Sequence, residues 1–388
     1  MAKHAALHAA LCLLIALGCG DNVAGDDAGG GGPDAGGGID AGPPGNQYVS
    51  EWQQGDPGLT SIDQVAFAPD GTLFLLDGAA GRIAAIDLGE ASESERDANH
   101  FEDLMRFGRS LADALGGGTD GLSIGDVDVH PITHEVFVTG RSSTASGLVR
   151  TDGAGTVLAV DLSDVRHAVV TFSPDAAGSY GADLDLSSTH LFASVGSRSF
   201  TSGRVISVPF PLGAGSASSA ATTRTYHRSH RQWEESDTVA PVDRLMVVDD
   251  ADPPFLAASY ACAPVVRLPA SDVVSGGQVL GQTPFDVGAG RQLLDLFGYS
   301  SGGADRVLIT YNASDGMRIL LRADRALLEQ TEAIDEAAPV VVDGTHMPSD
   351  TRVTRYPEYD GVLAVAPRGD HRFVIVFGDG RVSTRDLP

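Results

Sequence analysis

Short apolar runs separated by polar turns recur along this chain from about residue 60 to its end. In the first unit, the alternating residues Val65 and Phe67 lead through a Pro-Asp-Gly turn to the apolar run Leu73–Leu76, and a Gly-rich turn leads on to Arg82–Asp87. Runs of four to six residues bounded by Gly, Pro and Asp are typical of antiparallel strands joined by tight turns. The pattern therefore predicts a β-meander.

The same strand–turn–strand unit occurs six times. The paired strands are expected at Gln64–Phe67 with Leu73–Leu76, Asp126–Val129 with Val136–Val138, Asp183–Leu186 with Leu191–Val195, Arg244–Val248 with Phe255–Ser259, Leu293–Phe297 with Arg306–Tyr311, and Val362–Val365 with Phe373–Phe377. Third strands are expected at Arg82–Asp87, Thr156–Leu162, Arg204–Phe210, Val265–Leu268, Met317–Leu321 and Arg381–Asp386, and fourth strands are clearest at Arg166–Phe172 and Thr222–His227. Repeated four-stranded antiparallel units are typical of propeller blades. We therefore predict an all-β chain that forms a single six-bladed β-propeller.

The sixth unit ends after its third strand, because the chain stops at Pro388. A ring of blades must close, and a missing outer strand would leave an open sheet edge. We predict that Gln47–Gln53, at the N-terminal end of the propeller, supplies this strand. A two-domain β-sandwich protein is the competing fold, but it would not explain the repeated units. The long segment Arg322–Asp360 leaves room for a seventh blade around Pro339–Asp343.

One insertion has helical rather than strand-like spacing. Between Asp97 and Leu115, apolar residues recur three to four positions apart, and the pattern stops at Gly116. We predict one short helix on the surface of the ring.

The first residues have the pattern of an export signal. Met1–Gly18 has a basic start and an apolar run that is shorter than the roughly 20 residues needed to span a bilayer. The run ends Ala16-Leu17-Gly18-Cys19, which resembles the lipobox of bacterial lipoproteins. The resemblance implies cleavage before Cys19 and acylation of that residue with diacylglycerol and palmitate; an ordinary secretory signal with an incidental cysteine is the alternative.

The segment that follows Cys19 contains little besides Gly, Asp, Ala and Pro, and it cannot bury a core. We expect a lipidated cysteine and flexible tether at residues 19–46 and the propeller at residues 47–388. About 27 flexible residues reach roughly 30 Å. The predicted location is the bacterial cell envelope, with the protein held by its lipid in the outer membrane, on the periplasmic or the surface side.

The negative net charge and the scarcity of lysine argue against several classes of function. The formal charge is −26 at pH 7, and the sole lysine, Lys3, lies in the leader. Nucleic acid is not an expected partner, because its binding requires a basic surface. Schiff-base chemistry and P-loop phosphate binding both need a lysine that the mature chain would lack.

Aspartates stand at or just before the start of successive inner strands. These residues are Asp63, Asp126, Asp183, Asp243 and Asp360. Because inner strands line the channel of a propeller, we expect these carboxylates to ring its mouth. Converging carboxylates repel unless a cation or protons neutralise them, and hard oxygen ligands suit calcium or magnesium. The alternative is that aspartates are simply common in strand-entry turns.

Two further groups are candidate ligand sites. His227, His230, Glu234 and Glu235 combine imidazole and carboxylate groups, which suit transition metals; the alternative is a solvated polar loop. Arg141 and Arg198 fall in matching Ser/Thr-rich loops between second and third strands. They could hold an anionic or sugar ligand on the same face as the aspartates, or serve solubility alone.

The strand–Pro-turn–strand units resemble those of a broad bacterial group of propeller repeats that includes WD-like, surface-layer-type and gluconolactonase-like proteins. The resemblance covers about residues 47–388 and does not identify one function, because propellers host hydrolases, binders and scaffolds. Without a recognisable catalytic set, we predict a binding or scaffold module for protein or carbohydrate. The alternative that the resemblance implies is a divalent-metal-dependent, lactonase-like hydrolase at the channel mouth.

Overall fold

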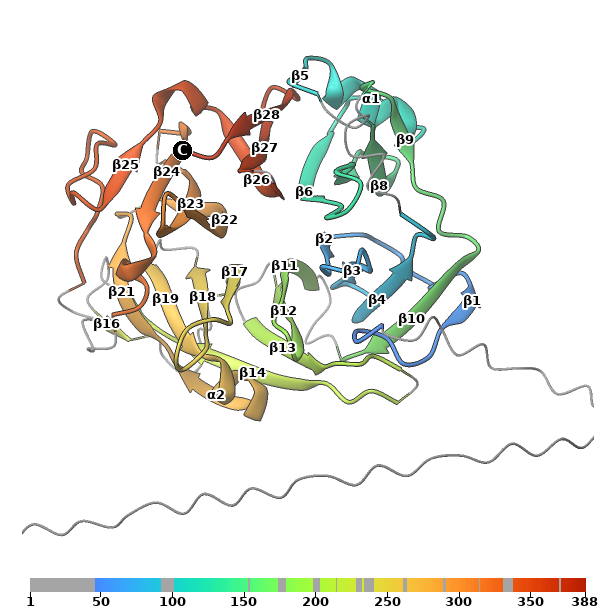
Figure 1. Ribbon diagram of the computed structural model, residues 1–388, viewed down its shortest axis with the longest axis horizontal. Coiled ribbons are helices and arrows are strands. Elements are labelled where there is room, and N and C mark those ends of the chain that lie inside the picture. Colours follow the sequence, from blue (N-terminus) through green and yellow to red (C-terminus); the bar gives the residue numbers. More distant parts are fainter. Residues whose placement is uncertain are drawn as a thin grey trace, which may run out of the picture. The chain divides into compact units, whose positions relative to one another are not determined.

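Six sheets of four or five strands make up most of the described chain (Figure 1). The computed structural model is described for residues 46–91, 101–152, 154–173, 179–197, 203–213, 215–227, 232–233, 241–260, 264–288, 291–313, 315–330, 338–369 and 371–388. All of these residues belong to one compact unit, 41–388.

We number the sheets by the chain order of their innermost strands. Sheet 1 contains β2 (Gln64–Phe67), β3 (Leu73–Asp77), β4 (Arg82–Asp87), β10 (Val165–Thr171) and β1 (Gln53–Gly55). Sheet 2 contains β6 (Ser123–Val129), β7 (Val136–Arg141), β8 (Ser146–Thr151) and β9 (Val157–Ala159). Sheet 3 contains β11 (Ser179–Leu186), β12 (His190–Ser197), β13 (Gly203–Pro209), β14 (Ser219–Arg224) and β20 (Gly277–Leu280).

The remaining sheets come from the C-terminal half and one earlier segment. Sheet 4 contains β17 (Val242–Val248), β18 (Phe255–Tyr260), β19 (Pro264–Pro269) and β21 (Gln282–Asp286). Sheet 5 contains β22 (Gln292–Ser301), β23 (Ala304–Asn312), β24 (Arg318–Asp324) and β25 (Val353–Arg355). Sheet 6 contains β26 (Val362–Gly369), β27 (Arg372–Phe377), β28 (Val382–Asp386) and β5 (Asp103–Leu104). A separate two-stranded sheet pairs β15 (Tyr226–His227) with β16 (Gln232–Trp233).

The innermost strands pack against one another in a closed ring. Going round it, β2 contacts β6, β6 contacts β26, and β22, β17 and β11 follow before the ring returns to β2 (Figure 1). The predicted fold class, a single all-β propeller with six blades, is confirmed. The ring does not follow chain order, however, because sheet 2 lies between sheets 1 and 6.

Apolar packing between neighbouring sheets holds the ring together. Six buried apolar clusters occur among the described residues, and each lies at one sheet–sheet interface. Phe137 of sheet 2 packs with Leu73 of sheet 1, for example, and Val374 of sheet 6 packs with Val136 of sheet 2. Each blade thus buries its faces against both neighbours, as a closed ring requires.

The strand that completes the sixth sheet is not the predicted one. β28 pairs with β5, where Asp103 lies opposite Ser383 and Leu104 opposite Val382. Gln53, at the end of the predicted closing strand Gln47–Gln53, instead begins β1, which pairs with β10 at the outer edge of sheet 1. The reason is the position of sheet 2. The chain must pass the edge of sheet 6 to enter sheet 2.

The same detour explains a second difference. The predicted fourth strand Arg166–Phe172 is present as β10, but it returns to sheet 1 and pairs with β4 after sheet 2 is complete. The predicted third strand Thr156–Leu162 contains β9, which is the fourth strand of sheet 2, and β8 is the third.

The described part of the chain contains two short α-helices. The helix α1 (Phe107–Ala114) lies in the predicted helical insertion and buries Phe107 and Leu111, whereas α2 (Ala270–Ser275) was not predicted. No helix in the described part of the chain is long and apolar enough to cross a membrane. Around Pro339–Asp343 the described residues form isolated bridges to Asp286 and Pro348 and no seventh sheet.

Candidate functional site

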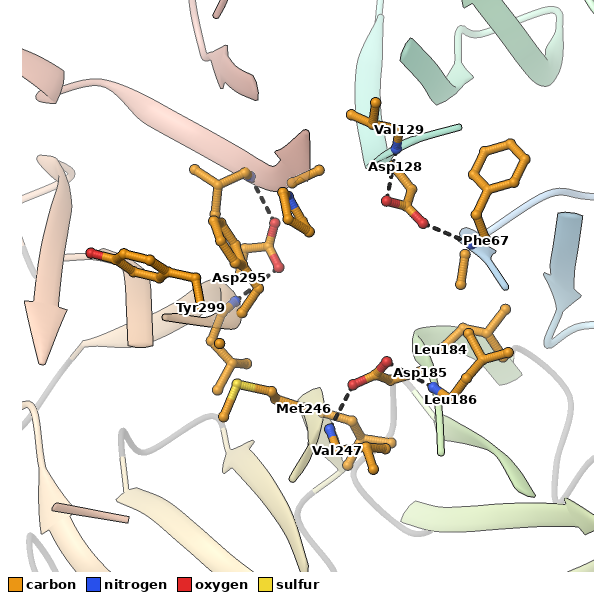
Figure 2. A pocket seen from close by; sticks show the side chains of 18 of the residues that line it. Phe67, Asp128, Val129, Leu184, Asp185, Leu186, Met246, Val247, Asp295 and Tyr299 are labelled. Carbon is orange, nitrogen blue, oxygen red and sulfur yellow. Dashed lines mark hydrogen bonds between the residues drawn. The ribbon is translucent and has the colours of Figure 1, made fainter. Parts of the chain in front are cut away.

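The inner strands surround a central cavity of about 600 Å³ (Figure 2). Five aspartates on the inner strands of three sheets line it: Asp126 and Asp128 from β6, Asp183 and Asp185 from β11, and Asp295 from β22; a sixth, Asp250, follows β17. Within each strand, paired aspartates are two residues apart, a spacing that places both side chains on the same side of the strand.

A β-bulge lies at or immediately before the first of these aspartates in each strand. The pairing register shifts between Ile124 and Val127, between Gly181 and Asp183, and between Leu293 and Asp295. Bulges bend a strand and redirect its side chains. At the first of them the backbone N–H of Asp126 is taken up by the Thr139 hydroxyl, with 2.8 Å between the heavy atoms.

The aspartates bind the backbone of the neighbouring sheet. Asp183 and Asp185 of sheet 3 accept the N–H groups of Leu245 and Val247 in sheet 4, at 2.5 and 2.6 Å. The other three make the same contact. Asp126 accepts from Val65 at 3.0 Å, Asp128 from Phe67 at 2.7 Å and Asp295 from Val365 at 2.8 Å.

These contacts follow from the position of the inner strands. Each inner strand is the edge of its sheet, so the N–H groups on its free side have no strand partner. Buried N–H groups need an acceptor, and the carboxylates provide one. The second carboxylate oxygen accepts the N–H of the following residue, for example Leu186 for Asp185 and Val129 for Asp128, both at 2.7 Å.

Burial raises the pKa of all five carboxyl groups, and the N–H donors offset only part of that effect. The pKa rises from 3.8 to about 6 for Asp126 and Asp185, to about 7 for Asp295 and to about 8 for Asp128. The pKa of Asp183 is also raised well above its usual value by burial.

Arg244 places a positive charge close to these carboxyl groups. Burial lowers its pKa, but Asp183, Asp295 and Asp126 raise it by more. Its guanidinium donates to the carbonyl oxygens of Ala182 in sheet 3 and Leu294 in sheet 5. Arg244 therefore joins the two neighbours of its own sheet 4.

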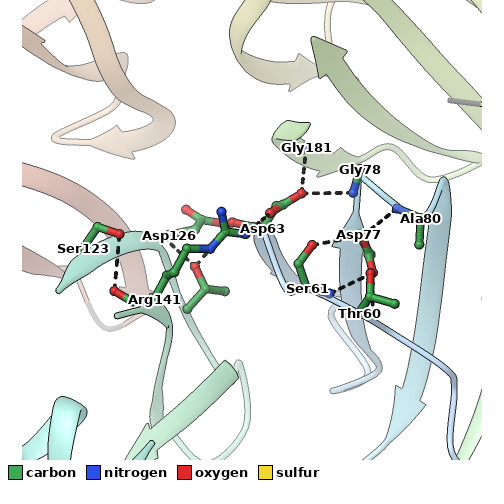
Figure 3. A network of polar contacts seen from close by, with 11 residues as sticks. Thr60, Ser61, Asp63, Asp77, Gly78, Ala80, Ser123, Asp126, Arg141 and Gly181 are labelled. Carbon is green, nitrogen blue, oxygen red and sulfur yellow. Dashed lines mark hydrogen bonds and ion pairs between the residues drawn. The ribbon is translucent and has the colours of Figure 1, made fainter. Parts of the chain in front are cut away.

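A second cavity, of about 400 Å³, is lined by residues around Gln64. We call it the Gln64 pocket; its lining is Ile62, Asp63, Gln64, Ser123, Gly125, Thr139, Gly140, Arg141, Tyr180 and Gly181. Arg141 approaches Asp63 with 3.4 Å between Nη2 and Oδ1 (Figure 3). The other oxygen of Asp63 accepts N–H groups from Gly78 at 3.0 Å and Gly181 at 2.8 Å. Asp63 thus joins sheets 1 and 3, and burial raises its pKa.

Gln64 is the unusual residue of this pocket. Its side chain is only 5% exposed, and its Oε1 atom has no hydrogen-bond partner among the described residues. A buried acceptor without a donor costs about 1–3 kcal/mol. An unsatisfied buried group in a native structure calls for an explanation, and a bound molecule that supplies the donor is one.

Asp77 makes the wall of the pocket rigid. It is fully buried and accepts from the backbone N–H groups of Thr60, Ser61 and Ala80 at 2.6, 2.9 and 2.8 Å (Figure 3). Burial raises its pKa, but these bonds and that of the Thr60 hydroxyl outweigh burial and leave the pKa below its usual value. The segment leading into Asp63 is thereby fixed.

The structure separates the five aspartates that the sequence grouped together. Asp126 and Asp183 line the central cavity, and Asp63 lines the Gln64 pocket. Asp243 accepts from the Gln292 amide at 3.3 Å, and Asp360 pairs with Arg355 at 2.7 Å. Within the described ranges, no group of three or more His, Cys, Asp or Glu side chains is arranged to hold a metal ion.

Other candidates lie wholly or partly outside the described residues. Cys19, Arg198, His230, Glu234 and Glu235 are outside them. His227 is the last residue of β15, and only its backbone is described. Arg141 is the last residue of β7 and lines the same pocket as Asp63.

Sequence reasoning missed Asp128, Asp185, Asp295, Arg244 and Gln64. A signal was present for the first two, because GDVDV and ADLDL place aspartates at alternate positions in otherwise apolar strands. The unpaired oxygen of Gln64 has no such signal, since it depends on what the folded chain brings near it.

No protein-family model matches the chain, and no curated protein matches its sequence. Among solved structures, virginiamycin B lyase from Staphylococcus aureus aligns over 87% of this chain and 88% of its own, with 10% identity and a TM-score of 0.32. The C-terminal WD40 domain of Sif2 aligns over 89% and 100%, with 8% identity and a TM-score of 0.29. The extracellular region of plexin A4 aligns over 88% and 40%, with 8% identity and a TM-score of 0.35.

Proposed function

We propose that this chain is an exported, lipid-anchored protein of the bacterial cell envelope whose propeller binds a neutral sugar in the Gln64 pocket. The export signal, Cys19 and the Gly-rich tether support the anchor. The binding part of the proposal rests on one observation: Gln64, which lines a cavity of about 400 Å³, has a buried Oε1 without a donor. That volume lies within the range of roughly 300–1,000 Å³ typical of small-molecule sites.

The pocket's chemistry favours a neutral, hydroxyl-rich ligand. Asp63 and Arg141 are its only formally charged lining residues, and their charges cancel. A cation or an anion would gain little there. A sugar hydroxyl can donate to Gln64 Oε1 and accept from the half-exposed Arg141, while Tyr180 offers an aromatic ring to the apolar face of the sugar.

The metal-dependent hydrolase is the weaker alternative. It would place calcium or magnesium among Asp63, Asp126, Asp183, Asp243 and Asp360. Both oxygens of Asp183 already accept backbone N–H groups, from Leu184 at 2.9 Å and Leu245 at 2.5 Å. Elemental analysis of the dialysed protein separates the two functions. About one bound divalent ion per chain, lost on Asp183→Asn substitution, would favour the hydrolase.

Calorimetric titration of the full chain with neutral sugars, namely glucose, galactose, N-acetylglucosamine and cellobiose, tests the binding proposal. Glucuronate serves as the charged comparison. We expect at least one neutral sugar to bind and the Gln64→Leu variant to lose that binding. The thermal midpoint of Gln64→Leu should equal or exceed that of the wild type, because the substitution removes an unsatisfied buried acceptor.

Arg150 provides a matched control for Arg141. Both arginines are in sheet 2, their side chains are 46% and 48% exposed, and each faces one carboxylate. Arg141→Gln should weaken sugar binding, and Arg150→Gln should not. Unchanged binding by Gln64→Leu, or no binding of any neutral sugar by the wild type, would contradict the proposal.

The anchor is tested separately by Cys19→Ser. The substituted protein should move from the membrane fraction to the soluble fraction. If it stays with the membrane, acylation of Cys19 is not what holds it there.

A further inference from the structure

We propose that a second site, a groove beside the N-terminus of α1, binds a phosphate group. The groove has a volume of about 580 Å³ and is separate from the central cavity. We call it the arginine groove, because Arg106, Arg109 and Arg318 line it and Asp379 is its only acidic lining residue. This formal charge of +2 is exceptional in a chain whose net charge is −26.

The arginines of this groove differ from the others in the described part of the chain. Most other arginine side chains have hydrogen-bond or ion-pair partners, such as Glu135 for Arg150, Asp87 for Arg166 and three carboxylates for Arg325. Arg267 instead packs over the Phe255 ring. The side chains of Arg106 and Arg318 make no hydrogen bond or ion pair with the described residues, and both line the groove. Arg109 has only a long contact to Asp113, at 3.9 Å.

The position of Arg106 at the N-terminus of α1 makes the positive charge of the arginine groove more unfavourable. Arg106 occupies the N-cap of α1, makes no capping hydrogen bond, and the first turn contains no acidic residue. A cation at a helix N-terminus opposes the helix dipole, whereas an anion there is stabilised by about 0.3–1 kcal/mol. Bound phosphate would relieve the repulsion that the free groove carries.

The floor of the groove is held in place by a close approach of two glycines. The N–H of Gly108 donates to the Gly380 carbonyl at 2.8 Å, which fixes the start of α1 to the β27–β28 turn. A methyl group on either glycine would lie 3.2 Å from the Cα of the other. Arg318 packs over the backbone of Gly378 in the same turn, so its guanidinium has a fixed support.

Guanidinium groups recognise phosphate through paired N–H donors, and the charge-assisted bonds are roughly twice as strong as neutral ones. A phosphate dianion offsets two arginines better than a monovalent carboxylate does. The phosphate can belong to a soluble phosphate ester or to a lipid headgroup. The exposed side chain of Met105, 68% accessible, adjoins the arginines and would contact the apolar part of either ligand.

Titration of the full chain with inorganic phosphate, glycerol 3-phosphate and acetate tests the proposal. Co-sedimentation of the full-length Cys19→Ser chain with phosphatidylglycerol or phosphatidylcholine vesicles separates the lipid source from the soluble one. We expect phosphate compounds to bind and acetate to bind at least tenfold more weakly. Arg106→Gln and Arg318→Gln should each weaken phosphate binding about tenfold, the effect of losing one hydrogen bond to a charged group.

Two controls keep the test independent of folding. Arg106→Gln should keep or raise the thermal midpoint, since it removes a cation from a helix N-terminus, and Arg150→Gln should bind phosphate as the wild type does. Asp379→Asn should tighten phosphate binding, because it removes the only acidic side chain of the groove. The proposal is overturned if the Arg106→Gln, Arg318→Gln double variant binds phosphate normally, if acetate binds as well as phosphate, or if no phosphate compound or vesicle binds.

Discussion

Asp185 of sheet 3 accepts the backbone N–H of Val247 in sheet 4, with 2.6 Å between the carboxylate oxygen and the nitrogen. This contact explains why the largely apolar inner strands also carry five aspartates that line the cavity. The inner strand of each blade has one free edge, and buried N–H groups on that edge need acceptors. A carboxylate from the next blade satisfies them and joins the two blades at the same time.

The raised pKa of Asp128 predicts how stability depends on pH. Its pKa is about 8 in the folded protein and near 3.8 when exposed, so the folded chain binds this proton more tightly. The free energy of unfolding should therefore fall as pH rises from about 4 to 8. Asp126 and Asp185 contribute to this raised pKa as neighbouring acidic groups.

Asp128→Asn is always neutral, so it should flatten that dependence. Urea unfolding at pH 5, 6, 7 and 8 measures the slope. The exposed Asp120→Asn serves as the control and should follow the wild type. An Asp128→Asn variant with the wild-type slope would show that this carboxyl group does not hold its proton in the folded state.

Arg244→Leu removes the cation that offsets Asp183, Asp295 and Asp126. It also leaves two carbonyl oxygens without their donor. We expect a loss on the order of 3–5 kcal/mol at pH 7, as for other broken buried ion pairs. The loss should be smaller at pH 5, which lies below the pKa of about 6 for Asp126 and of about 7 for Asp295, so that these two carboxyl groups are mostly protonated.

Calorimetric unfolding of Arg244→Leu at the two pH values checks this prediction. Arg166→Leu breaks the partly exposed pair with Asp87, in which the two side chains are 38% and 25% accessible, and it should cost far less at either pH. Equal losses at pH 5 and pH 7 for Arg244→Leu would mean that the neighbouring carboxylates are not the cause.

The closure of the ring predicts reciprocal effects of two proline substitutions. Leu104→Pro disrupts β5 and should speed amide hydrogen exchange in β28 (Val382–Asp386), its partner. Gln54→Pro disrupts β1 and should speed exchange in β10 (Val165–Thr171) instead. Faster exchange in β28 after Gln54→Pro would contradict this pairing and would indicate that the N-terminal segment closes the ring.

The local sequence pattern was sufficient to predict most of the strands. β2 and β4 begin and end at the predicted residues, because alternating apolar positions and Gly-rich turns are local features. The position of Asp126 and Asp183 on the channel was also predictable, since both stand in inner strands.

Strand exchange between blades was not predictable in the same way. β5 has two residues, too few for any periodicity, and nothing in the segment Val165–Thr171 marks it as a partner of β4. These pairings depend on the insertion of sheet 2 between sheets 1 and 6, a long-range packing outcome. The Gln64 pocket depends on the same insertion, because its residues come from sheets 1, 2 and 3.

The thermal unfolding of Asp185→Asn compared with Asp249→Asn tests the structural role of the channel aspartates most directly. Asp249 also joins sheets 3 and 4, through the Ser188 N–H at 2.9 Å, but it is exposed to solvent. In Asp185→Asn the side-chain oxygen can still accept one of the two backbone N–H groups. The side-chain NH₂ group then faces the other N–H group and cannot accept its hydrogen bond. We predict that Asp185→Asn loses about 1–3 kcal/mol of unfolding free energy and that Asp249→Asn stays within about 0.5 kcal/mol of wild type. Equal midpoints for the two variants, or a more stable Asp185→Asn, would contradict the account.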